Sequence, residues 1–279
     1  MNRYIGTYLL AMLLPLVLWA QEPETLIRYV KTDGAYTNDG KSWDKAKNNI
    51  QDAINDLYDQ IKNTDKQGHV YVAAGTYYPT ESTESGKDGT AYTAFKIYEG
   101  ITVYGGFDAT TPEASPSERE FTDKNSSPTP YYYGKKFTHV TILDGNHTNM
   151  GDKKNLEWNE TKQQYTTTFP GNSYHVVWFA TKGFDANGRA NGLDKPARLD
   201  GCTIRGGYAS NRTITGARQH NSYGGGIYMV AGSYVDNCIV TQNVATRAGG
   251  AIYLDGGGEV DHSYVRYNQS LGVGISEGF

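Results

Sequence analysis

Short runs in which apolar and polar side chains alternate recur along most of the chain, separated by residues that favour turns. Such runs lie at residues 70–72, 101–103, 140–142 and 176–178. Alternation with a period of two predicts strands that bury one face. The successive separations, about 31, 39 and 36 residues, leave room for long loops between the strands.

One segment has the spacing of a helix. Its apolar residues are Ile50, Ala53, Ile54, Leu57 and Ile61. This spacing predicts an amphipathic helix from Asn49 to about Ile61. We expect this helix to cover one end of the strand core, where unpaired edges would otherwise be exposed. Binding of a partner by the apolar face is the alternative.

The C-terminal part of the chain contains an internal repeat. Residues 224–228 and 233–243 align without gaps with 249–253 and 258–268, at a constant offset of 25 residues. An earlier copy at 199–204 aligns with 235–240 at an offset of 36, and a loop within 210–223 accommodates the difference. A period near 25, built from short strands and tight turns, predicts one coil of a parallel β-helix. Each coil would contribute two or three strands, about 4.8 Å from those of the next coil.

Alternation assigns the faces of the repeated strands. Six residues are expected to point inward: Cys202, Ile204, Cys238, Val240, Ser263 and Val265. Six are expected to point outward: Thr203, Arg205, Ile239, Thr241, Tyr264 and Arg266. Asn243 and Asn268 end equivalent strands, where Asn tolerates left-handed backbone and stacked amides bond between coils. Gly207 takes the same place one coil earlier.

Three insertions are rich in polar residues, at 79–94, 108–136 and 146–172. In the third, residues 156–159 and 164–167 are expected to pair as a hairpin. The chain stops just after residues 274–275, which resemble the start of another coil, so we expect the sequence to be part of a longer protein.

The N-terminus is typical of an export signal. Arg3 precedes an apolar run at residues 9–18, and residues 18–20 (Leu-Trp-Ala) resemble a cleavage site before Gln21. Ten apolar residues interrupted by Pro15 are too few for a membrane span, which needs about 20. We predict cleavage near Ala20, and a secreted or cell-surface location. The expected organisation is a signal peptide at 1–20, a strand and capping helix at 21–68, and a β-helix at 69–279.

Composition agrees with short strands and tight turns. The chain has 33 Gly, 23 Tyr and only 38% hydrophobic residues. Its net charge is −4, and no run of Lys and Arg is present. Nucleic acid is therefore not an expected partner.

Several of these motifs resemble known β-helix families. Residues 240–243 followed by 249–252 (VTQN, then GGAI) resemble the repeats of polymorphic outer-membrane-protein-like β-helices. Residues 141–146 and 199–207 are similar to segments of the wider pectin-lyase-like superfamily. The N-terminal block, residues 29–77, resembles the opening of exported β-helix proteins of Bacteroidetes. The resemblance implies an all-β fold, a right-handed parallel β-helix, and says little about function.

Three acidic residues occupy one repeat position: Asp200, Asp236 and Asp261. Stacked about 5 Å apart, three carboxylates repel unless a cation or backbone donors intervene. Related lyases bind Ca²⁺ with acidic clusters on neighbouring coils, so the resemblance makes these residues candidate Ca²⁺ ligands. The alternative is that each Asp caps its own turn and faces water.

Other candidate residues lie on the expected outer faces. Arg205 is a candidate base for a lyase, because that reaction needs a basic group near the proton removed. Arg205 and Arg266 are also candidate ligand-binding cations, or simply solubilising groups. Tyr228 and Tyr253 are expected to stack on the surface, where they would bind sugar rings or form a ladder without a ligand.

Cys202 and Cys238 are expected to stack inward on neighbouring coils. Export permits a disulfide, but parallel side-chain directions favour a buried pair of thiols. His175 lies in a strand without an identifiable carboxylate partner, so we expect a structural role.

Two functions from different classes remain. The first is a non-catalytic, adhesin-like module that binds a polysaccharide or a host surface protein. The second is a carbohydrate-active enzyme, a polysaccharide lyase or glycoside hydrolase acting on acidic polysaccharide. The absence of a concentrated acid–base cluster favours the first.

Overall fold

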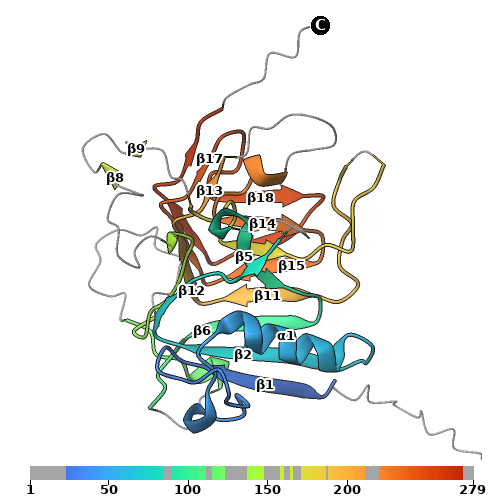
Figure 1. Cartoon of the computed structure of the whole chain (residues 1–279), viewed down its shortest axis with the longest axis vertical. Helices are drawn as coiled ribbons and strands as arrows, with labels where there is room; N and C mark the ends of the chain where they lie inside the picture. The colour runs from blue at the N-terminus through green and yellow to red at the C-terminus, as the bar shows by residue number, and fades with distance from the viewer. Residues whose placement is uncertain are drawn as a thin grey trace, which may run out of the picture.

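The computed structural model describes most of the chain between residues 23 and 272 (Figure 1). The described ranges are 23–83, 89–110, 115–122, 137–147, 171–186, 188–210 and 220–272, with backbone alone at 158–159 and 164–165. The expected signal peptide and the segment after residue 272 lie outside these ranges.

Most described strands belong to parallel sheets that run along the long axis of the molecule (Figure 1). The first sheet has six strands: β1 (Thr25–Val30), β2 (Gln67–Ala73), β6 (Ile101–Phe107), β11 (Ala197–Asp200), β15 (Ser233–Asp236) and β19 (Glu259–Asp261). The second sheet has five: β3 (Gly75–Tyr77), β7 (Thr141–Asp144), β12 (Cys202–Arg205), β16 (Ile239–Thr241) and β20 (Tyr264–Arg266).

The remaining strands complete each turn of the chain. The third sheet contains β5 (Thr93–Ile97), β10 (Val177–Phe179), β14 (Ile227–Val230) and β18 (Ile252–Asp255), with β4 (Glu81–Ser82) antiparallel to β5. A smaller sheet joins β13 (Tyr208–Ala209), β17 (Val244–Ala245) and β21 (Gln269–Ser270). β8 (Trp158–Asn159) and β9 (Gln164–Tyr165) pair as the expected hairpin. From β14 to β18 the chain passes through four sheets in turn, rather than the two or three strands expected.

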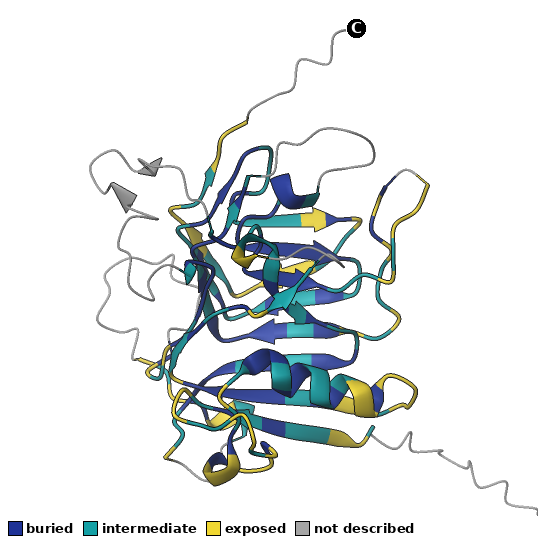
Figure 2. Cartoon of the chain, in the orientation of Figure 1, coloured by how far each residue is buried: buried dark blue, intermediate teal, exposed yellow. Residues whose placement is uncertain are grey.

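Helical structure is scarce among the described residues. The α-helix α1 spans Ile50–Ile61, and short 3₁₀ turns occur at Trp43–Lys45 (η1), Thr90–Tyr92 (η2), Pro116–Glu118 (η3) and His220–Ser222 (η5). The Asn49 side chain accepts hydrogen bonds from the backbone N–H groups of Gln51 and Asp52, which fixes the start of α1. The apolar face of α1 is buried against β1 and β2 (Figure 2).

The strand register confirms the 25-residue repeat. Val240 pairs with Val265, Val235 with Val260, and Ile227 with Ile252. The earlier offset of 36 is also confirmed, because Ile204 pairs with Val240. Equivalent residues of successive turns therefore lie side by side.

The four early strands expected from alternation are divided among three sheets. The strands at 70–72 and 101–103 are neighbours in the first sheet, but β7 belongs to the second sheet and β10 to the third. β5 of the third sheet begins within the segment expected to be an insertion at 79–94. Alternation identifies a strand with one buried face, and it carries no information about which sheet that strand joins.

The expected faces of β12 and β16 are confirmed. Cys202, Ile204, Cys238 and Val240 are buried, whereas Thr203, Arg205, Ile239 and Thr241 are partly exposed. Val265 lies beside Val240 yet is 49% exposed, because β20 is the last strand of its sheet. Leu254 and Val260 are exposed on the neighbouring last strands, β18 and β19. Exposed stretches are visible at the upper end of the stack (Figure 2).

The Asn ladder is present, although the left-handed residue is not Asn. The Asn243 Oδ1 accepts from Gly207 N at 3.0 Å, and the Asn268 Oδ1 accepts from Asn243 N at 3.0 Å. The positive φ values belong to the preceding residues, Gly206 (79°), Gln242 (57°) and Tyr267 (51°). The turn therefore places the left-handed residue first, and the Asn that follows uses its amide to bond between turns of the chain.

Candidate functional site

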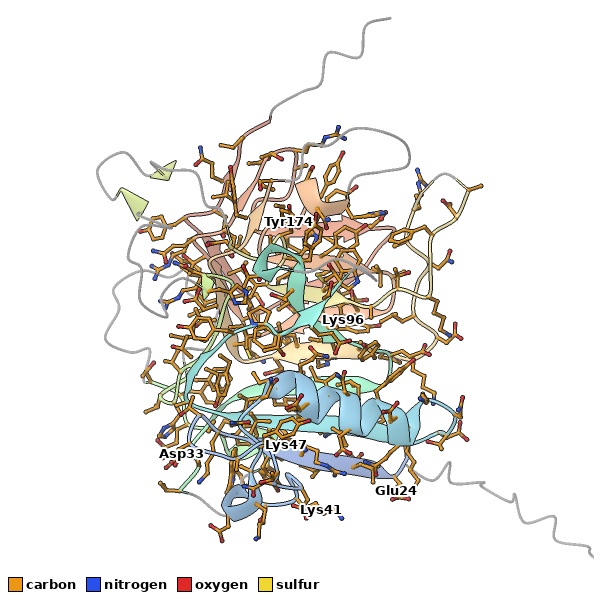
Figure 3. All side chains as sticks on the ribbon, in the orientation of Figure 1. Glu24, Asp33, Lys41, Lys47, Lys96 and Tyr174 are labelled. Atoms are coloured by element: carbon orange, nitrogen blue, oxygen red, sulfur yellow. The ribbon has the colours of Figure 1, made fainter. Side chains whose placement is uncertain are left out.

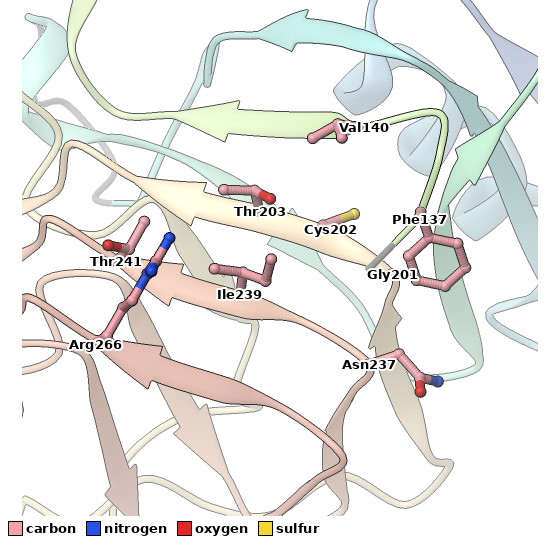
Figure 4. A pocket seen from close by; sticks show the side chains of 9 residues that line it. All are labelled: Phe137, Val140, Gly201, Cys202, Thr203, Asn237, Ile239, Thr241 and Arg266. Atoms are coloured by element: carbon pink, nitrogen blue, oxygen red, sulfur yellow. The ribbon is translucent and has the colours of Figure 1, made fainter. Parts of the chain in front are cut away.

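A groove lies on the outer face of the second sheet, and we call it the β12–β16 groove (Figure 4). Its cavity volume is about 160 Å³. The lining residues are Phe137, Val140, Gly201, Cys202, Thr203, Asn237, Ile239, Thr241 and Arg266. The floor comes from outward side chains of β12 and β16, because alternation turns Thr203, Ile239 and Thr241 away from the core. Most of the exposed lining is apolar.

One wall of the groove belongs to a connection rather than to a strand. Phe137 and Val140 lie on the segment that enters β7, and Figure 4 shows them beside Gly201 and Thr203. The ring of Phe137 lies 4.5 Å from that of Phe121 and 4.5 Å from the guanidinium of Arg119. Phe137 itself is only 5% exposed. The wall is therefore packed in place rather than free in solvent.

Arg119 connects this wall to the first sheet. Its Nη2 donates to Asp200 Oδ1 at 2.8 Å, its Nη1 to Gly105 O at 2.8 Å, and its Nε to Pro116 O at 2.8 Å. Both Arg119 and Asp200 are buried. Asp200 also accepts from Asn237 Nδ2 at 3.2 Å, which orients the amide at this end of the groove. Sequence reasoning missed Arg119 and Phe137, because their distance in sequence from β12 hides the contact.

Arg266 supplies the positive charge of the groove. It reaches from β20 toward Thr241 on β16, its partner in register (Figure 4). The guanidinium lies 5.2 Å from the ring of Tyr264 and 5.1 Å from that of Tyr267. These rings restrain the guanidinium through cation–π contacts. Among the described residues no carboxylate forms an ion pair with Arg266, so the charge is available to a ligand.

The three stacked carboxylates are in register, as expected, but each has a basic neighbour. Asp200 pairs with Asp236, and Asp236 with Asp261. Arg119 neutralises Asp200, Arg198 lies 3.4 Å from Asp236, and His262 lies 3.2 Å from both Asp236 and Asp261. Within the described ranges, no group of three or more His, Cys, Asp or Glu side chains is arranged to hold a metal ion. The alternative prediction, that each Asp caps its own turn and faces water, is wrong for Asp200, which is only 6% exposed.

Arg205 is bound to a buried partner. It pairs in register with Asp144, and its Nε donates to Asp144 Oδ2 at 2.8 Å. Asp144 is 1% exposed. The guanidinium is thereby held against a buried carboxylate. The geometry gives Arg205 a structural contact and places it outside the lining of the groove.

The prediction that Tyr228 and Tyr253 stack on the surface is correct for their register and wrong for the exposure of Tyr228. Tyr228 and Tyr253 are in register, with ring centroids 5.6 Å apart, but Tyr228 is fully buried. Its ring stacks on Trp178 at 4.4 Å, and its hydroxyl donates to buried Asp255. His220 Nδ1 lies 2.8 Å from the same hydroxyl. Residues brought from other parts of the chain cover Tyr228, so only the partly exposed Tyr253 remains a candidate for ligand contact.

The two cysteines are buried free thiols, as expected. Burial raises the pKa of both, and that of Cys238 rises to about 12. Thiols with such pKa values remain protonated and are poor nucleophiles. They contribute apolar volume to the core.

His175 lies just before β10 rather than within the strand expected from the sequence, because the paired strand begins only at Val177. It is 1% exposed, and its Nδ1 lies 2.9 Å from the carbonyl oxygen of Gly224. Burial lowers its pKa to about 4. This environment agrees with the structural role expected of it.

Comparison of the chain with protein-family models, with curated proteins and with solved structures found no match. Within the described part of the chain, none of the helices is both long and apolar enough to cross a membrane.

Proposed function

We propose that the protein is an exported right-handed parallel β-helix whose β12–β16 groove binds an acidic glycan without catalysis. The four-sheet winding and the 25-residue register support the β-helix. The position of α1 against β1 and β2 supports its role as the N-terminal cap. The export signal in the sequence supports a secreted or cell-surface location.

The observation that carries the function is the free guanidinium of Arg266 at one end of an apolar groove. Val140, Ile239 and the methyl groups of Thr203 and Thr241 offer a surface for the C–H face of a sugar ring. A guanidinium binds carboxylates through charge-assisted hydrogen bonds. A uronate combines both properties, so an oligouronate is the ligand that this chemistry fits.

The lining of the groove supports binding rather than catalysis. The described lining residues include no Asp, Glu, His or Lys. Lyase and hydrolase chemistry both require a positioned acid or base near the reacting bond. Arg205, the candidate base expected from the sequence, is held by Asp144 and does not line the groove.

The test is calorimetric titration of the protein with trigalacturonate at low and high salt. We expect saturable binding that weakens with salt, and at least a tenfold loss for Arg266→Gln. Arg189→Gln, an exposed residue outside the groove, is the matched control and should bind as the unaltered protein does. Equal affinity for neutral galactotriose, or release of unsaturated uronates from polygalacturonate, would contradict the proposal.

A further inference from the structure

A second cavity lies beside β1, the first strand of the stack, and we call it the η1 cavity. Its volume is about 300 Å³. It is lined by Tyr29, Lys41, Ser42, Trp43, Asp44, Ala109 and Thr110. Lys41 lies at the end of the stack that carries β1 (Figure 3). This cavity is remote in sequence from every residue of the β12–β16 groove.

Backbone hydrogen bonds hold the walls of the η1 cavity. Tyr29 N donates to Gly40 O at 2.7 Å, and Lys47 N donates to Tyr29 O at 2.9 Å. The segment that carries Lys41 and Trp43 is therefore attached along the edge of β1. Opposite it, Thr110 is positioned by Asp108, whose Oδ1 accepts from Thr110 N at 2.9 Å.

The interior of the η1 cavity is aromatic. The rings of Tyr29 and Trp43 lie 4.8 Å apart, edge to face, and Trp43 also lies 5.9 Å from Phe107. Trp43 is only 6% exposed, and its indole Nε1–H has almost no exposed surface and no hydrogen-bond partner among the described residues. Trp43 therefore contributes part of its ring to the wall of the cavity, while its N–H group lies behind that wall.

The mouth of the cavity carries polar groups of both kinds. Lys41, Ser42, Asp44 and Thr110 are exposed there. Among the described residues, neither the ammonium of Lys41 nor the carboxylate of Asp44 has an ion-pair partner. One provides donors and the other acceptors, while the two hydroxyls provide both.

We propose that the η1 cavity binds a neutral sugar residue. A pyranose has an apolar C–H face that packs on aromatic rings and hydroxyl groups that both donate and accept. The opposite charges of Lys41 and Asp44 balance, so the site offers no net attraction to an anion. This distinguishes the η1 cavity from the groove, where Arg266 is the only charged residue among the described lining residues.

The indole N–H signal of Trp43 provides a direct test, because the chain has only four Trp residues. The ¹H–¹⁵N spectrum of the protein is recorded during titration with neutral trisaccharides: cellotriose, chitotriose and galactotriose. The signal is assigned by its loss in Trp43→Phe. We expect a saturable shift of this signal with at least one trisaccharide.

The exposed Asp44 allows a variant that leaves the fold intact. Asp44→Asn should weaken binding at least fivefold, because a carboxylate accepts hydroxyl hydrogen bonds more strongly than an amide. Asp33→Asn, on the same segment but outside the cavity lining, is the matched control and should bind unchanged. The proposal would be overturned if no trisaccharide shifts the signal or if Asp44→Asn has no effect. It would also be overturned if the signal shifts instead with a zwitterionic amino acid such as glycine or tyrosine. Because Arg266 plays no part here, this result is independent of the oligouronate test.

Discussion

His175 illustrates how burial controls the chemistry of a single residue. Its imidazole contacts the ring of Trp178, with centroids 4.9 Å apart, and lies 5.4 Å from the ring centroid of Tyr228. Desolvation disfavours the imidazolium form and lowers the pKa to about 4. In the folded protein His175 is therefore neutral across the range where an ordinary His becomes protonated.

The pKa of His175 predicts a pH dependence of stability. Between pH 6.5 and about 4 the unfolded chain binds a proton at His175 and the folded chain does not. The contribution of His175 to the free energy of unfolding should therefore be fully present above pH 6.5. It should fall as the pH is lowered toward 4, by about 3 kcal/mol in total. The pKa values of His69 and His147 are also lowered by burial, which adds a loss of the same sign. Urea unfolding at pH 7, 6 and 5 measures the slope.

Two variants separate His175 from other titrating groups. His175→Gln should reduce the slope between pH 7 and 5, whatever its effect on stability at pH 7. Asn63→Gln, which changes an exposed residue without a titrating group, should keep the slope. An unchanged slope in His175→Gln would contradict the assignment.

At the scale of elements, the turn after β16 depends on one amide. Asn243 is fully buried, and its Nδ2 donates to Thr241 O at 2.9 Å and to Ile204 O at 3.1 Å. Its Oδ1 accepts from Gly207 N at 3.0 Å. A single side chain thus satisfies backbone groups of two successive turns.

Asn243→Ala should lower the free energy of unfolding by about 2–3 kcal/mol, because buried backbone groups lose their partners. Asn268→Ala should cost less, since Asn268 is only partly buried. Exposed Asn63→Ala serves as the control, with no change expected. Chemical denaturation measures all three, and equal values for Asn243→Ala and Asn63→Ala would contradict this account.

At the scale of the whole molecule, the repeat carried more information than any local motif. The 25-residue offset predicted the pairing of Val240 with Val265 and the buried faces of β12 and β16. It did not predict how β7 and β10 divide between sheets, because one-sided burial is the same in each sheet. It also missed the burial of Tyr228, since Trp178 and His220 reach that ring from other strands and turns.

The candidate site was less predictable for the same reason. Arg266 could be chosen from its outward position, but the partners of Asp200 and Arg205 could not. Arg119 and Asp144 lie 81 and 61 residues away from them in sequence. Contacts of this kind follow from how the connections fold back on the sheets, and alternation within strands does not encode them.

The ion pair between Arg119 and Asp200 predicts that the stability of the fold depends strongly on the connection that carries Arg119. Arg119→Ala leaves the buried carboxylate of Asp200 without its cation, and should lower the free energy of unfolding by roughly 3–5 kcal/mol. Arg198→Ala removes a partner of the less buried Asp236, so it should cost roughly 1 kcal/mol or less. Arg119→Ala combined with Asp200→Asn should recover part of the loss. Thermal and urea unfolding distinguish these outcomes, and equal costs for the two Arg variants would contradict the prediction.

The position of Phe137 and Val140 on a connection matters for how ligand preference changes among related proteins. The floor of the β12–β16 groove is built from paired strands, and a substitution there risks the register of the stack. The wall belongs to a connection outside the named strands, held by a single β-bridge between Phe137 and Phe121 and by a hydrogen bond from Gly75 N to Val140 O. Related chains would therefore be able to exchange this wall, and with it the shape of the ligand they accept, while every strand keeps its place.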